Sequence, residues 1–540
     1  MTRSKGWLAL VAMIAGAASA QTVSVPTFSP ERIKADVGFL ADDLLERRNV
    51  GDRGYDLAAR WVAARFEALG LAPGGTQGYY QNVPFSMTRT EPAKPSALSF
   101  GGRRLTTGPD VFIGPSPLVP SIDESADAVF VGYGLEDPRF RLDDYRGLDV
   151  KGKVVVILYG TPSDLPSDVA ATLNDRKLDI AAAKGAIGAV LIATPAILQL
   201  FPWALILEDF DTPRLRWIDK SGQPHVDNPS IRLSAVVSPS GAAALFKGAP
   251  QSWDAIAAAI KNKTARPRGF VLPGQIRFER YGRSQKTNSP NVIGIIPGSD
   301  PRLANEVVML TGHLDHDGIV PAKNGDTIKN GAMDNAAGIA TMLEAARAFV
   351  DSGKRPKRTL MFVALTAEED GLLGSEYLAE YPVLAGKKVV ANVNLDMPIL
   401  TYDFSDVIAF GAEHSTLGPV VDRAVSMIGV KLSPDPEPAE GLFTRSDHYS
   451  FVKKGIPAVY LKTGYAGTGK VASEEFRKHH YHQVSDDMKL PFNWQAAAKF
   501  ANVNYLIARE IADAPTAPQW YEGSFFGDKF AAGQPKARKP

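Results

Sequence analysis

Two adjacent glutamates, Glu368 and Glu369, follow the apolar run RTLMFVAL. A run of this kind predicts a buried strand, so the two carboxylates stand where that strand ends. Taken alone, such a pair is typical of a solvated turn that also caps the next helix. Two neighbouring carboxylates at a buried edge can instead divide two tasks, one binding a metal ion and the other moving protons. The rest of the chain has to decide between these interpretations.

Residue types that bind metals stand at the ends of other predicted strands and at one helix start in the same half of the chain. Ligands of open α/β sheets bind beyond the carboxyl ends of the strands, so these residues are expected at one edge. Several carboxylates there cannot all ionise without cations between them. Imidazole and carboxylate ligands suit zinc, and two metals about 3.5–4 Å apart can share a carboxylate. The segments are, in order, GHLDH (312–316), MDNAAG (333–338), the glutamate pair, NLDM (394–397) and HHYHQVSDD (479–487).

Each of these residues has an ordinary explanation when it is taken alone. His313 would be a hydrogen-bonded core histidine, and Asp334 would cap the helix that follows it. His316 and Asp317 would be plain turn residues. The ordered combination, with a base beside a ligand, is what predicts a catalytic metal site.

Strands and helices alternate from about residue 285 onward. Apolar strand patterns such as NVIGIIPG, EVVMLTGH and KVVANVNL are separated by helical periodicity over 334–350 and 374–382, and a helix over 493–513 closes the region. This alternation predicts an α/β fold: a three-layer α/β/α arrangement around a mostly parallel sheet. Two further helices are expected within residues 30–72, and short strands with Gly/Pro turns follow them.

The middle of the chain has its own α/β texture, and a length of 540 residues is too great for one core. We expect residues 21–118 to be the N-terminal part of the catalytic region. Residues 119–268 would be an inserted smaller α/β domain, and 269–512 the main domain. The proline-rich residues 513–540 would form a loose tail.

The first twenty residues have the layout of a cleavable secretory signal. Arg3 and Lys5 precede a short apolar run that ends in Ala18-Ser19-Ala20. The run is too short to span a bilayer comfortably, and no later segment is apolar enough, so no membrane span is expected after cleavage. This predicts a secreted or periplasmic protein.

The composition excludes several function classes. The chain has no cysteine, which excludes disulfides, a lipid anchor on cysteine and a cysteine nucleophile. Any metal site must therefore use His, Asp and Glu. The formal net charge of +1, without a basic field or a recognisable module, gives no indication of nucleic-acid binding.

The ordered motifs resemble those of the zinc aminopeptidases of peptidase family M28 (clan MH), over residues 30 to 510. The resemblance implies a zinc-exopeptidase-like fold. The stretch VGYGL…DDYRGLDVKGKVVVILYG…AAAKGAIGAVLIA resembles the protease-associated (PA) domain that is often inserted in this family. Two departures are the segment LLERRNVGDRG, where a Gly-Arg pair is common, and Pro398 after the NLDM strand end.

Residue roles follow from the resemblance and from it alone. It implies two Zn²⁺ per chain, with other divalent metals possible, and a Glu368 that takes a proton from a metal-bridging water and passes it to the leaving amine. Tyr481 would stabilise the oxyanion, Asp315 would fix the His313 ring, and Arg445 would touch substrate. The implied metal ligands are Asp334 as the bridge, His313 and Asp396 on one metal, and Glu369 and His482 on the other. Asp447 and Asp486 are further supporting residues, although helix capping explains Asp447 nearly as well.

The resulting prediction is an exported co-catalytic di-zinc aminopeptidase that acts on peptides, with the PA domain limiting access or shaping the pocket. A carboxypeptidase or dipeptidase of the same clan is an alternative, for which Arg445 is the candidate carboxylate ligand. A single-zinc, glutaminyl-cyclase-like acyltransferase is disfavoured because both ligand sets are present. A receptor-like protein without catalysis is disfavoured because all five ligands and Glu368 are retained.

Overall fold

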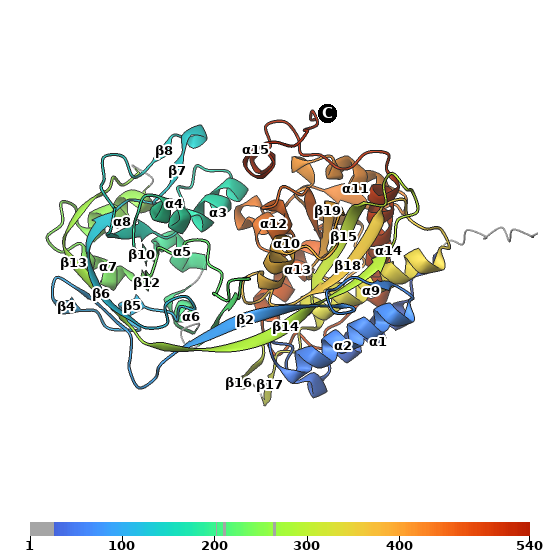
Figure 1. The fold of residues 1–540 in the computed structure, drawn as a ribbon, viewed down its shortest axis with the longest axis horizontal. Helices are drawn as coiled ribbons and strands as arrows, with labels where there is room; N and C mark the ends of the chain where they lie inside the picture. The colour runs from blue at the N-terminus through green and yellow to red at the C-terminus, as the bar shows by residue number, and fades with distance from the viewer. Residues whose placement is uncertain (1–25, 201, 209–211, 263–265, 324) are drawn as a thin grey trace, which may run out of the picture.

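The computed structural model describes residues 26–540 except 201, 209–211, 263–265 and 324. The predicted signal sequence, residues 1–20, lies outside the described residues. Two large sheets dominate the described part of the chain, and each has its own covering of helices (Figure 1). Among the described residues, no helix combines the length and the apolarity needed to cross a membrane.

The larger sheet belongs to a body formed by the N-terminal residues and the second half of the chain. Its strands are β1 (Ala72–Pro73), β2 (Tyr80–Thr90), β11 (Arg214–Trp217), β14 (Gly282–Ile296), β15 (Glu306–His313), β18 (Thr359–Leu365), β19 (Lys388–Leu395), β20 (Asp406–Phe410), β21 (Lys431–Ser433) and β22 (Ala458–Thr463). Its helices are α1 (Pro30–Leu40), α2 (Arg53–Ala68), α9 (Ala337–Asp351), α10 (Leu373–Glu380), α11 (Leu417–Ser426), α12 (His448–Val452), α13 (Gly469–His479), α14 (Trp494–Asp513) and α15 (Phe525–Phe530). A small hairpin, β16 (Ile319–Lys323) and β17 (Asp326–Ile328), projects from it.

The strand order of this sheet is β11-β2-β14-β18-β15-β19-β22-β20-β21, with β1 paired to β14. The four central strands β18, β15, β19 and β22 are parallel. Antiparallel pairs flank them, namely β14 with β18 on one side and β20 with β22 on the other. The predicted α/β sheet is present, but it is mixed: its parallel character is confined to the centre, where helices connect successive strands.

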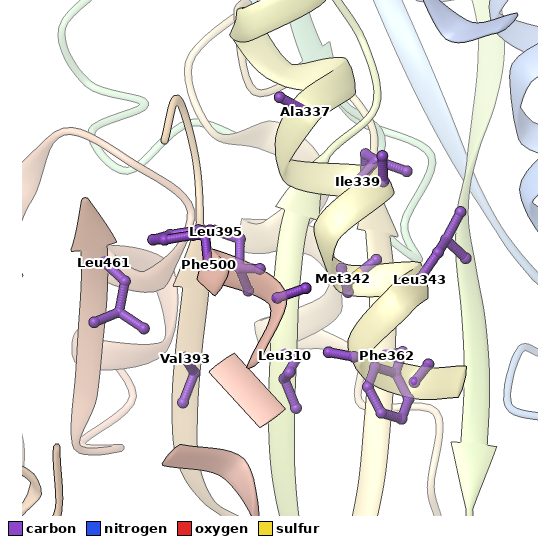
Figure 2. Packing of buried hydrophobic residues seen from close by; sticks show 14 of the residues in the cluster. Leu310, Ala337, Ile339, Met342, Leu343, Phe362, Val393, Leu395, Leu461 and Phe500 are labelled. Atoms are coloured by element: carbon purple, nitrogen blue, oxygen red, sulfur yellow. The ribbon is translucent and has the colours of Figure 1, made fainter. Parts of the chain in front are cut away.

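Both faces of the central strands are apolar, and neighbouring residues pack on opposite faces. Val308 and Leu310 of β15 belong to the cluster that includes α1, α9 and α14, whereas Val307 and Met309 belong to the cluster on the other face, with residues of α10 and α12. Figure 2 shows α9 lying over the first face, with Ile339 and Met342 above Leu310 and Phe362. Side chains alternate between faces along a strand, so near-continuous apolar runs build the three layers predicted from the sequence.

The second sheet is made by strands between residues 97 and 280. Its order is β4-β3-β13-β6-β9-β10-β12-β5, with parallel pairs among β6, β9, β10 and β12. The strands are β3 (Ala97–Phe100), β4 (Arg103–Arg104), β5 (Val111–Phe112), β6 (Ile122–Phe130), β9 (Val154–Leu158), β10 (Gly188–Ile192), β12 (Leu233–Val237) and β13 (Phe270–Arg280), with a separate pair β7 (Glu136–Asp137) and β8 (Leu142–Asp143). The helices are α3 (Ser167–Asp175), α4 (Lys177–Ala183), α5 (Pro195–Leu200), α6 (Trp203–Glu208), α7 (Pro239–Leu245) and α8 (Trp253–Lys261).

The strands of this second unit reach beyond the expected limits of residues 119–268. β3, β4 and β5 precede residue 119, and β13 follows residue 268. Conversely, β11 lies within those limits yet pairs with β2 in the larger sheet. The domain limits and the PA-like character of the insert stay predictions.

Two long strands connect the units. β2 and β14 pair antiparallel from Tyr80↔Val292 to Thr90↔Gly282. In Figure 1 they extend side by side from the larger body toward the second unit. The first entry of the chain into the second unit and its last exit therefore run along one shared hydrogen-bonded ladder.

The C-terminal residues differ from the loose tail that their proline content predicts. Trp520 is 1% exposed and Phe526 is 0% exposed, and both pack in a cluster with Phe443, Tyr449 and Tyr460. The indole of Trp520 also donates a hydrogen bond to the Gly455 carbonyl at 3.0 Å. Large aromatic side chains thus hold this segment against the body despite its prolines.

A buried lysine gives the second unit a pH-dependent stability. Lys177 is 2% exposed, and its ammonium donates to the carbonyls of Leu158, at 2.7 Å, and Gly160. Burial lowers the pKa of Lys177 from its usual value to about 7. The folded chain then binds fewer protons than the unfolded chain between pH 7 and the ordinary lysine pKa of about 10.4, so the stability contributed here rises with pH in that window.

We predict that Lys177→Met raises the free energy of unfolding more at pH 6.5 than at pH 9, with a difference of about 2 kcal/mol between the two pH values. Urea unfolding at both pH values measures it. Lys184→Met, on the partly exposed Lys184 at the end of the same helix, is the matched control and should shift stability equally at both. An equal effect of Lys177→Met at both pH values would contradict a lowered pKa of Lys177 in the folded chain.

Candidate metal centre

The sequence-predicted ligands meet at one edge of the larger sheet. β18, β15 and β19 are neighbouring parallel strands, so their carboxyl ends lie side by side. His313 is the last residue of β15, Glu368 and Glu369 follow β18, and Asp396 follows β19. The parallel centre of the sheet is therefore what brings together residues that are far apart in the chain.

Asp334 occupies the middle of the cluster and faces two histidines. Its Oδ1 lies 3.2 Å from Nε2 of His313, which is also 3.3 Å from Oδ1 of Asp396. Its Oδ2 lies 3.3 Å from Nε2 of His482, which is also 3.1 Å from Oε2 of Glu369. The five residues thus form two sets of three candidate ligands that share one carboxylate.

Asp334 is not the helix cap that its position suggested. It has φ −110° and ψ 88°, and α9 begins only at Ala337. The carboxylate of Asp486 accepts the amides of Met333 and Asp334 at 2.8 and 3.0 Å. Asp486 thus fixes the backbone at Asp334, while the Asp334 carboxylate faces the two histidines.

Asn335 ties this segment to the neighbouring strand end. Its side-chain amide donates to the Leu395 carbonyl at 2.9 Å, and its Oδ1 accepts the amides of Gly338 and Met397 at 3.1 and 3.2 Å. These bonds fix the segment of Asp334 against the residues that flank Asp396. The MDNAAG motif drew attention to Asp334, whereas the tie made by Asn335 became visible only in the structure.

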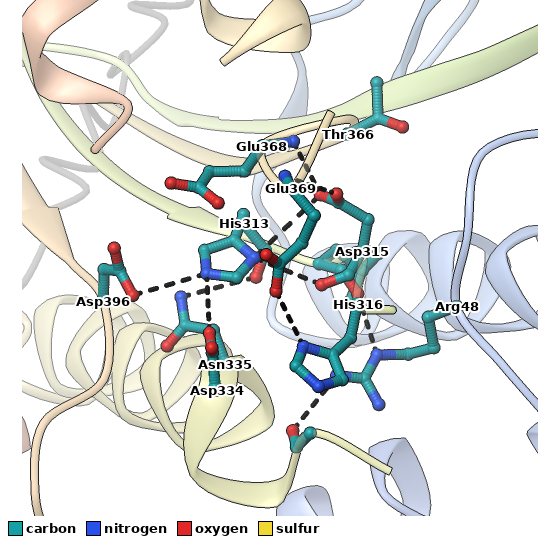
Figure 3. Close-up of polar contacts among 12 residues, drawn as sticks. Arg48, His313, Asp315, His316, Asp334, Asn335, Thr366, Glu368, Glu369 and Asp396 are labelled. Carbon is teal, nitrogen blue, oxygen red and sulfur yellow. Dashed lines mark hydrogen bonds and ion pairs between the residues drawn. The ribbon is translucent and has the colours of Figure 1, made fainter. Parts of the chain in front are cut away.

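Glu368 and Glu369 point in different directions, as Figure 3 shows. The Glu369 carboxylate reaches His316 and His482, while the Glu368 carboxylate extends to the other side and lines a cavity. Ala367, just before the pair, has φ +56°. A left-handed backbone is costly for a residue with a Cβ and is found where function constrains the chain. One glutamate can thereby join the ligands while its neighbour faces a substrate.

Two more ligand-bearing segments carry the same backbone feature. Met397, directly after Asp396, has φ +44°, and His482 itself has φ +54°. In each of these two segments the left-handed residue is the candidate ligand itself or its direct neighbour in the chain. The coincidence of three such positions with three ligand segments supports a functional constraint on the backbone.

The charges around the site separate the two glutamates. Burial would raise the pKa of Glu369, but the charge of His482 and the bond to His316 bring it down to about 2. Burial would likewise raise the pKa of Asp334, but the two histidines hold that pKa well below its usual range. For Glu368 burial prevails and raises the pKa well above the usual value. The carboxylates of Asp334 and Glu369 are therefore held ionised, and Glu368 sits where a proton is favoured.

The donor set fits zinc. Ligands about 2.0 Å from a tetrahedral zinc ion lie about 3.3 Å from one another, and the four contacts between histidine Nε2 and carboxylate oxygen measure 3.1–3.3 Å. The buried Nε2 of His482 makes no well-formed hydrogen bond with any described residue. His313, Asp334 and Glu369 also place one ligand atom each within 4.8 Å of one another.

Asp315 supports the site differently from the expected contact with the His313 ring. Nδ1 of His313 lies 3.1 Å from the backbone oxygen of Asp315 and 4.0 Å from its carboxylate. The carboxylate instead accepts the amides of Glu368 and Glu369, both at 3.1 Å. Asp315 therefore orients the histidine through its main chain and the glutamate pair through its side chain.

His316 was expected to be a plain turn residue, and the structure shows otherwise. It is 1% exposed, and its Nδ1 lies 2.8 Å from Oε1 of Glu369. An imidazole bonded to the second oxygen of a ligand carboxylate fixes the direction of the first. The GHLDH motif contained this signal, since its second histidine follows the first by three residues at a strand end.

A buried arginine from the N-terminal region lies beneath the site. Arg48 is 3% exposed and donates to the carbonyls of Leu314 (2.8 Å) and Gly331 (3.1 Å), and also to those of Leu40 and Asn330. It thus holds the segments that carry His313 and Asp334 to the N-terminal helices. Arg48 belongs to the stretch LLERRNVGDRG, which was noted from the sequence only as a departure from the family pattern. No role for Arg48 was predicted.

A chain of buried hydrogen bonds leads to Asp396. Ser446 donates to Oδ2 of Asp396 at 2.6 Å and accepts from the amide of Asn394 at 2.7 Å. Asn394 in turn accepts from Thr311 at 2.7 Å, which accepts from Asn392 at 3.0 Å. The chain crosses β15 and β19 and fixes the Asp396 oxygen that does not face His313.

The remaining predicted residues are also at or near the site. Tyr481 packs its ring 3.9 Å from that of His482 and lines the cavity. Arg445 lines the same cavity, where its Nη1 is 3.6 Å from Glu440. Asp447 is 0% exposed and makes no capping bond to α12, so helix capping does not account for it.

The cavity next to the ligands has a volume of about 750 Å³ and is lined by both units. Gly160, Thr161 and Ala171 come from the second unit, and Glu368 and Tyr460 from the larger body. The units also touch through the hydroxyls of Thr172 and Tyr449, 3.1 Å apart. The second unit therefore forms part of the cavity wall.

A family model described as peptidase family M28 matches residues 291–508. This span contains all five predicted ligands and Glu368. Residues 291–508 belong to peptidase family M28. The resemblance inferred from the ordered motifs is thereby confirmed for this part of the chain.

Curated relatives extend the M28 match in sequence. The chain is 25% identical over 311 residues to a protein named glutamate carboxypeptidase 2 homolog from Caenorhabditis elegans, covering 50% of this chain and 37% of that protein. It is 30% identical over 183 residues to a probable leucine aminopeptidase from Trichophyton verrucosum, covering 33% of this chain and 48% of that protein. The matched part spans less than half the length of these two relatives.

A solved structure supports the fold of the M28 region and its surroundings. The aminopeptidase from Aneurinibacillus sp. strain AM-1 superimposes with a TM-score of 0.51 at 19% identity, over 91% of this chain and 95% of that chain. At this identity the likeness shows the fold. The predicted α/β fold class is confirmed.

We predict that Ser446→Ala weakens zinc binding in the M28 region by about 10–100-fold, because it frees one oxygen of Asp396 and leaves the Asn394 amide without its acceptor. Competition with a fluorescent chelator measures the affinity. Ser450→Ala is the matched control: Ser450 is also buried and bonds the hydroxyl of Ser375 at 2.9 Å. Equal zinc affinity of the two variants would contradict a role of Ser446 in holding Asp396.

Proposed function

We propose that this chain is an exported zinc aminopeptidase that hydrolyses the N-terminal peptide bond of short peptides. The observation that carries the proposal is the shared carboxylate of Asp334, whose two oxygens face two histidines, each with its own additional carboxylate. Membership of residues 291–508 in peptidase family M28 supports the reaction class. The names of the curated relatives include both aminopeptidase and carboxypeptidase, so the end of the peptide that is cut belongs to the proposal.

Two zinc ions per chain would be held by the two ligand sets. His313, Asp334 and Asp396 would hold one ion, and Asp334, Glu369 and His482 the other. Bound zinc would supply Lewis acidity at the scissile carbonyl and lower the pKa of water. His313, Glu369 and Asp396 are each held by a residue outside the set, so these three need little rearrangement to bind.

Glu368 would act as the general base. Its carboxylate faces the cavity beside the ligands and is not needed as a ligand, since Glu369 serves there. It would take a proton from the attacking water and deliver it to the nitrogen of the leaving amine. The backbone amide of Glu368 is bonded to Asp315, which keeps the carboxylate in position during both transfers.

Tyr481 would stabilise the negative charge that develops on the carbonyl oxygen. It lines the cavity next to His482, and burial raises the pKa of its phenol well above the usual value. A phenol that keeps its proton is a hydrogen-bond donor at neutral pH. The free amine of the substrate would be attracted by the carboxylates around the site.

The second unit would limit which substrates reach the site. Residues of α3 and of the segment around Gly160 line the cavity together with the ligands. A cavity closed on one side by another unit accepts a short peptide more readily than a folded chain. The PA-like identity of this unit and the signal sequence at residues 1–20 are parts of the same proposal, because both suit an exported peptidase.

We predict that Glu368→Gln retains two zinc ions and loses at least about 100-fold in kcat, since only the proton carrier is removed. Metal analysis and peptide hydrolysis on the same sample measure both. Glu475→Gln, on the exposed Glu475 of α13, is the matched control and should keep zinc content and kcat. Full activity of Glu368→Gln would assign the base elsewhere.

We also predict two zinc ions per purified chain and release of the N-terminal residue from short peptides. Acetylation of the N terminus should abolish cleavage, while peptides with an amidated C terminus are still cut. A chelator should remove activity, and added zinc should restore it. Cleavage that survives acetylation but is lost on amidation would instead indicate a carboxypeptidase, and a chain without metal or cleavage would be a binding protein on this fold.

A further inference from the structure

The cavity has one wall that combines apolar side chains with a single cation. β20 and β22 are antiparallel neighbours, with Phe410 paired to Tyr460 and Ile408 paired to Lys462. Residues two apart on a strand share a face, and so do directly paired residues on adjacent strands. All four of these side chains line the cavity that also contains Glu368 and Asp396. Lys462 is therefore a cation set among Ile408, Phe410 and Tyr460.

Lys462 differs from the other basic residues of the cavity in having no carboxylate partner. Arg477 lies 2.7 Å from Glu437, and Arg445 lies 3.6 Å from Glu440. Within the described part of the chain, Lys462 forms no ion pair or hydrogen bond with the protein, and its ammonium lies 5.4 Å from the centre of the Tyr460 ring. A positive charge lodged in a cavity without a partner is costly unless a ligand supplies one.

The carboxylate at the neighbouring strand end, Asp396, is already engaged. β22 lies beside β19, with Leu461 paired to Leu395, so Lys462 stands close to the strand end that carries Asp396. Asp396 is held by His313 and Ser446. Once zinc offsets the ligand carboxylates, they attract Lys462 less. The free partner for this ammonium must then come from what enters the cavity.

We propose that Lys462 binds a substrate carboxylate close to the scissile bond, and that the enzyme therefore prefers short peptides that carry such a group. The inference rests on the proposed peptidase function and adds the substrate class to it. The carboxylate has two sources, the side chain of an acidic residue next to the scissile bond or the C terminus of a dipeptide. An ammonium that finds its partner only in the bound substrate favours that substrate over its uncharged amide.

Three pairs of peptides separate the sources in the zinc-loaded protein. Glu-Ala-NH₂ against Gln-Ala-NH₂ tests an acidic N-terminal residue, Ala-Glu-NH₂ against Ala-Gln-NH₂ an acidic second residue, and Leu-Ala against Leu-Ala-NH₂ the C-terminal carboxylate. We expect kcat/KM to favour the carboxylate member of at least one pair by about tenfold or more. In Lys462→Met the same ratio should fall to near unity, while Lys462→Arg should keep a clear preference.

The controls make the outcome decisive. Lys470→Met, on the exposed Lys470 of α13, should leave the ratio unchanged. Zinc content and melting temperature of Lys462→Met show whether it is folded and loaded, and Lys462→Arg gives a second, charge-retaining reading if it is not. Calorimetric binding of glutamate against glutamine to the wild type provides a measurement that does not depend on turnover.

The two ways of failing are distinct. Cleavage of the neutral peptides without any preference for a carboxylate, or a preference that survives in Lys462→Met, would overturn the role of Lys462 and leave the proposed function standing. No cleavage of any of the six peptides by the zinc-loaded chain would overturn the proposed function and this inference with it.

Discussion

One carboxylate shared between two histidines is the constraint on which the rest of the structure depends. Both oxygens of Asp334 are engaged, one toward His313 and one toward His482. Such an arrangement concentrates negative charge in a buried place. It is stable only where other groups of the protein hold each of these side chains in position. Asp486 and Asn335 hold the Asp334 segment, and the parallel strand ends bring the remaining ligands to the same edge.

The candidate ligands could be proposed from the sequence because they belong to short motifs, several of which follow a predicted strand. A predicted strand that is apolar throughout and is closed by a polar residue indicates the edge of a sheet. His313 and Asp396 could therefore be named as candidate metal-binding residues before the distance between them was known. Ser446 and Lys462 offered no such signal, because a serine fifty residues beyond its partner gains meaning only through contact. His316 was within a recognised motif, yet its bond to Glu369 depends on how the loop after β15 folds back.

The differences in the fold have the same origin. Periodicity predicts that a segment is a strand, but its direction relative to its neighbour depends on pairing across the chain. β2 and β14 are about two hundred residues apart and pair antiparallel, which makes the edge of the sheet mixed. In the C-terminal segment, composition suggested looseness, whereas the burial of Trp520 depends on a cluster assembled from distant residues. Asp315 likewise lies near the expected ring, but its carboxylate bonds two backbone amides across the site.

The paired strands β2 and β14 give the cavity a mechanical character. A single-chain tether lets a unit swivel about its bonds, whereas two strands held by cross-strand hydrogen bonds resist torsion and yield mainly by bending across their plane. The second unit contributes Gly160 and Ala171 to the cavity wall. Because it is connected through the paired strands β2 and β14, we expect it to bend relative to the larger body more readily than it rotates. Bending of these strands would change the width of the cavity, although none of their paired residues lines it, and the contact between Thr172 and Tyr449 opposes that change.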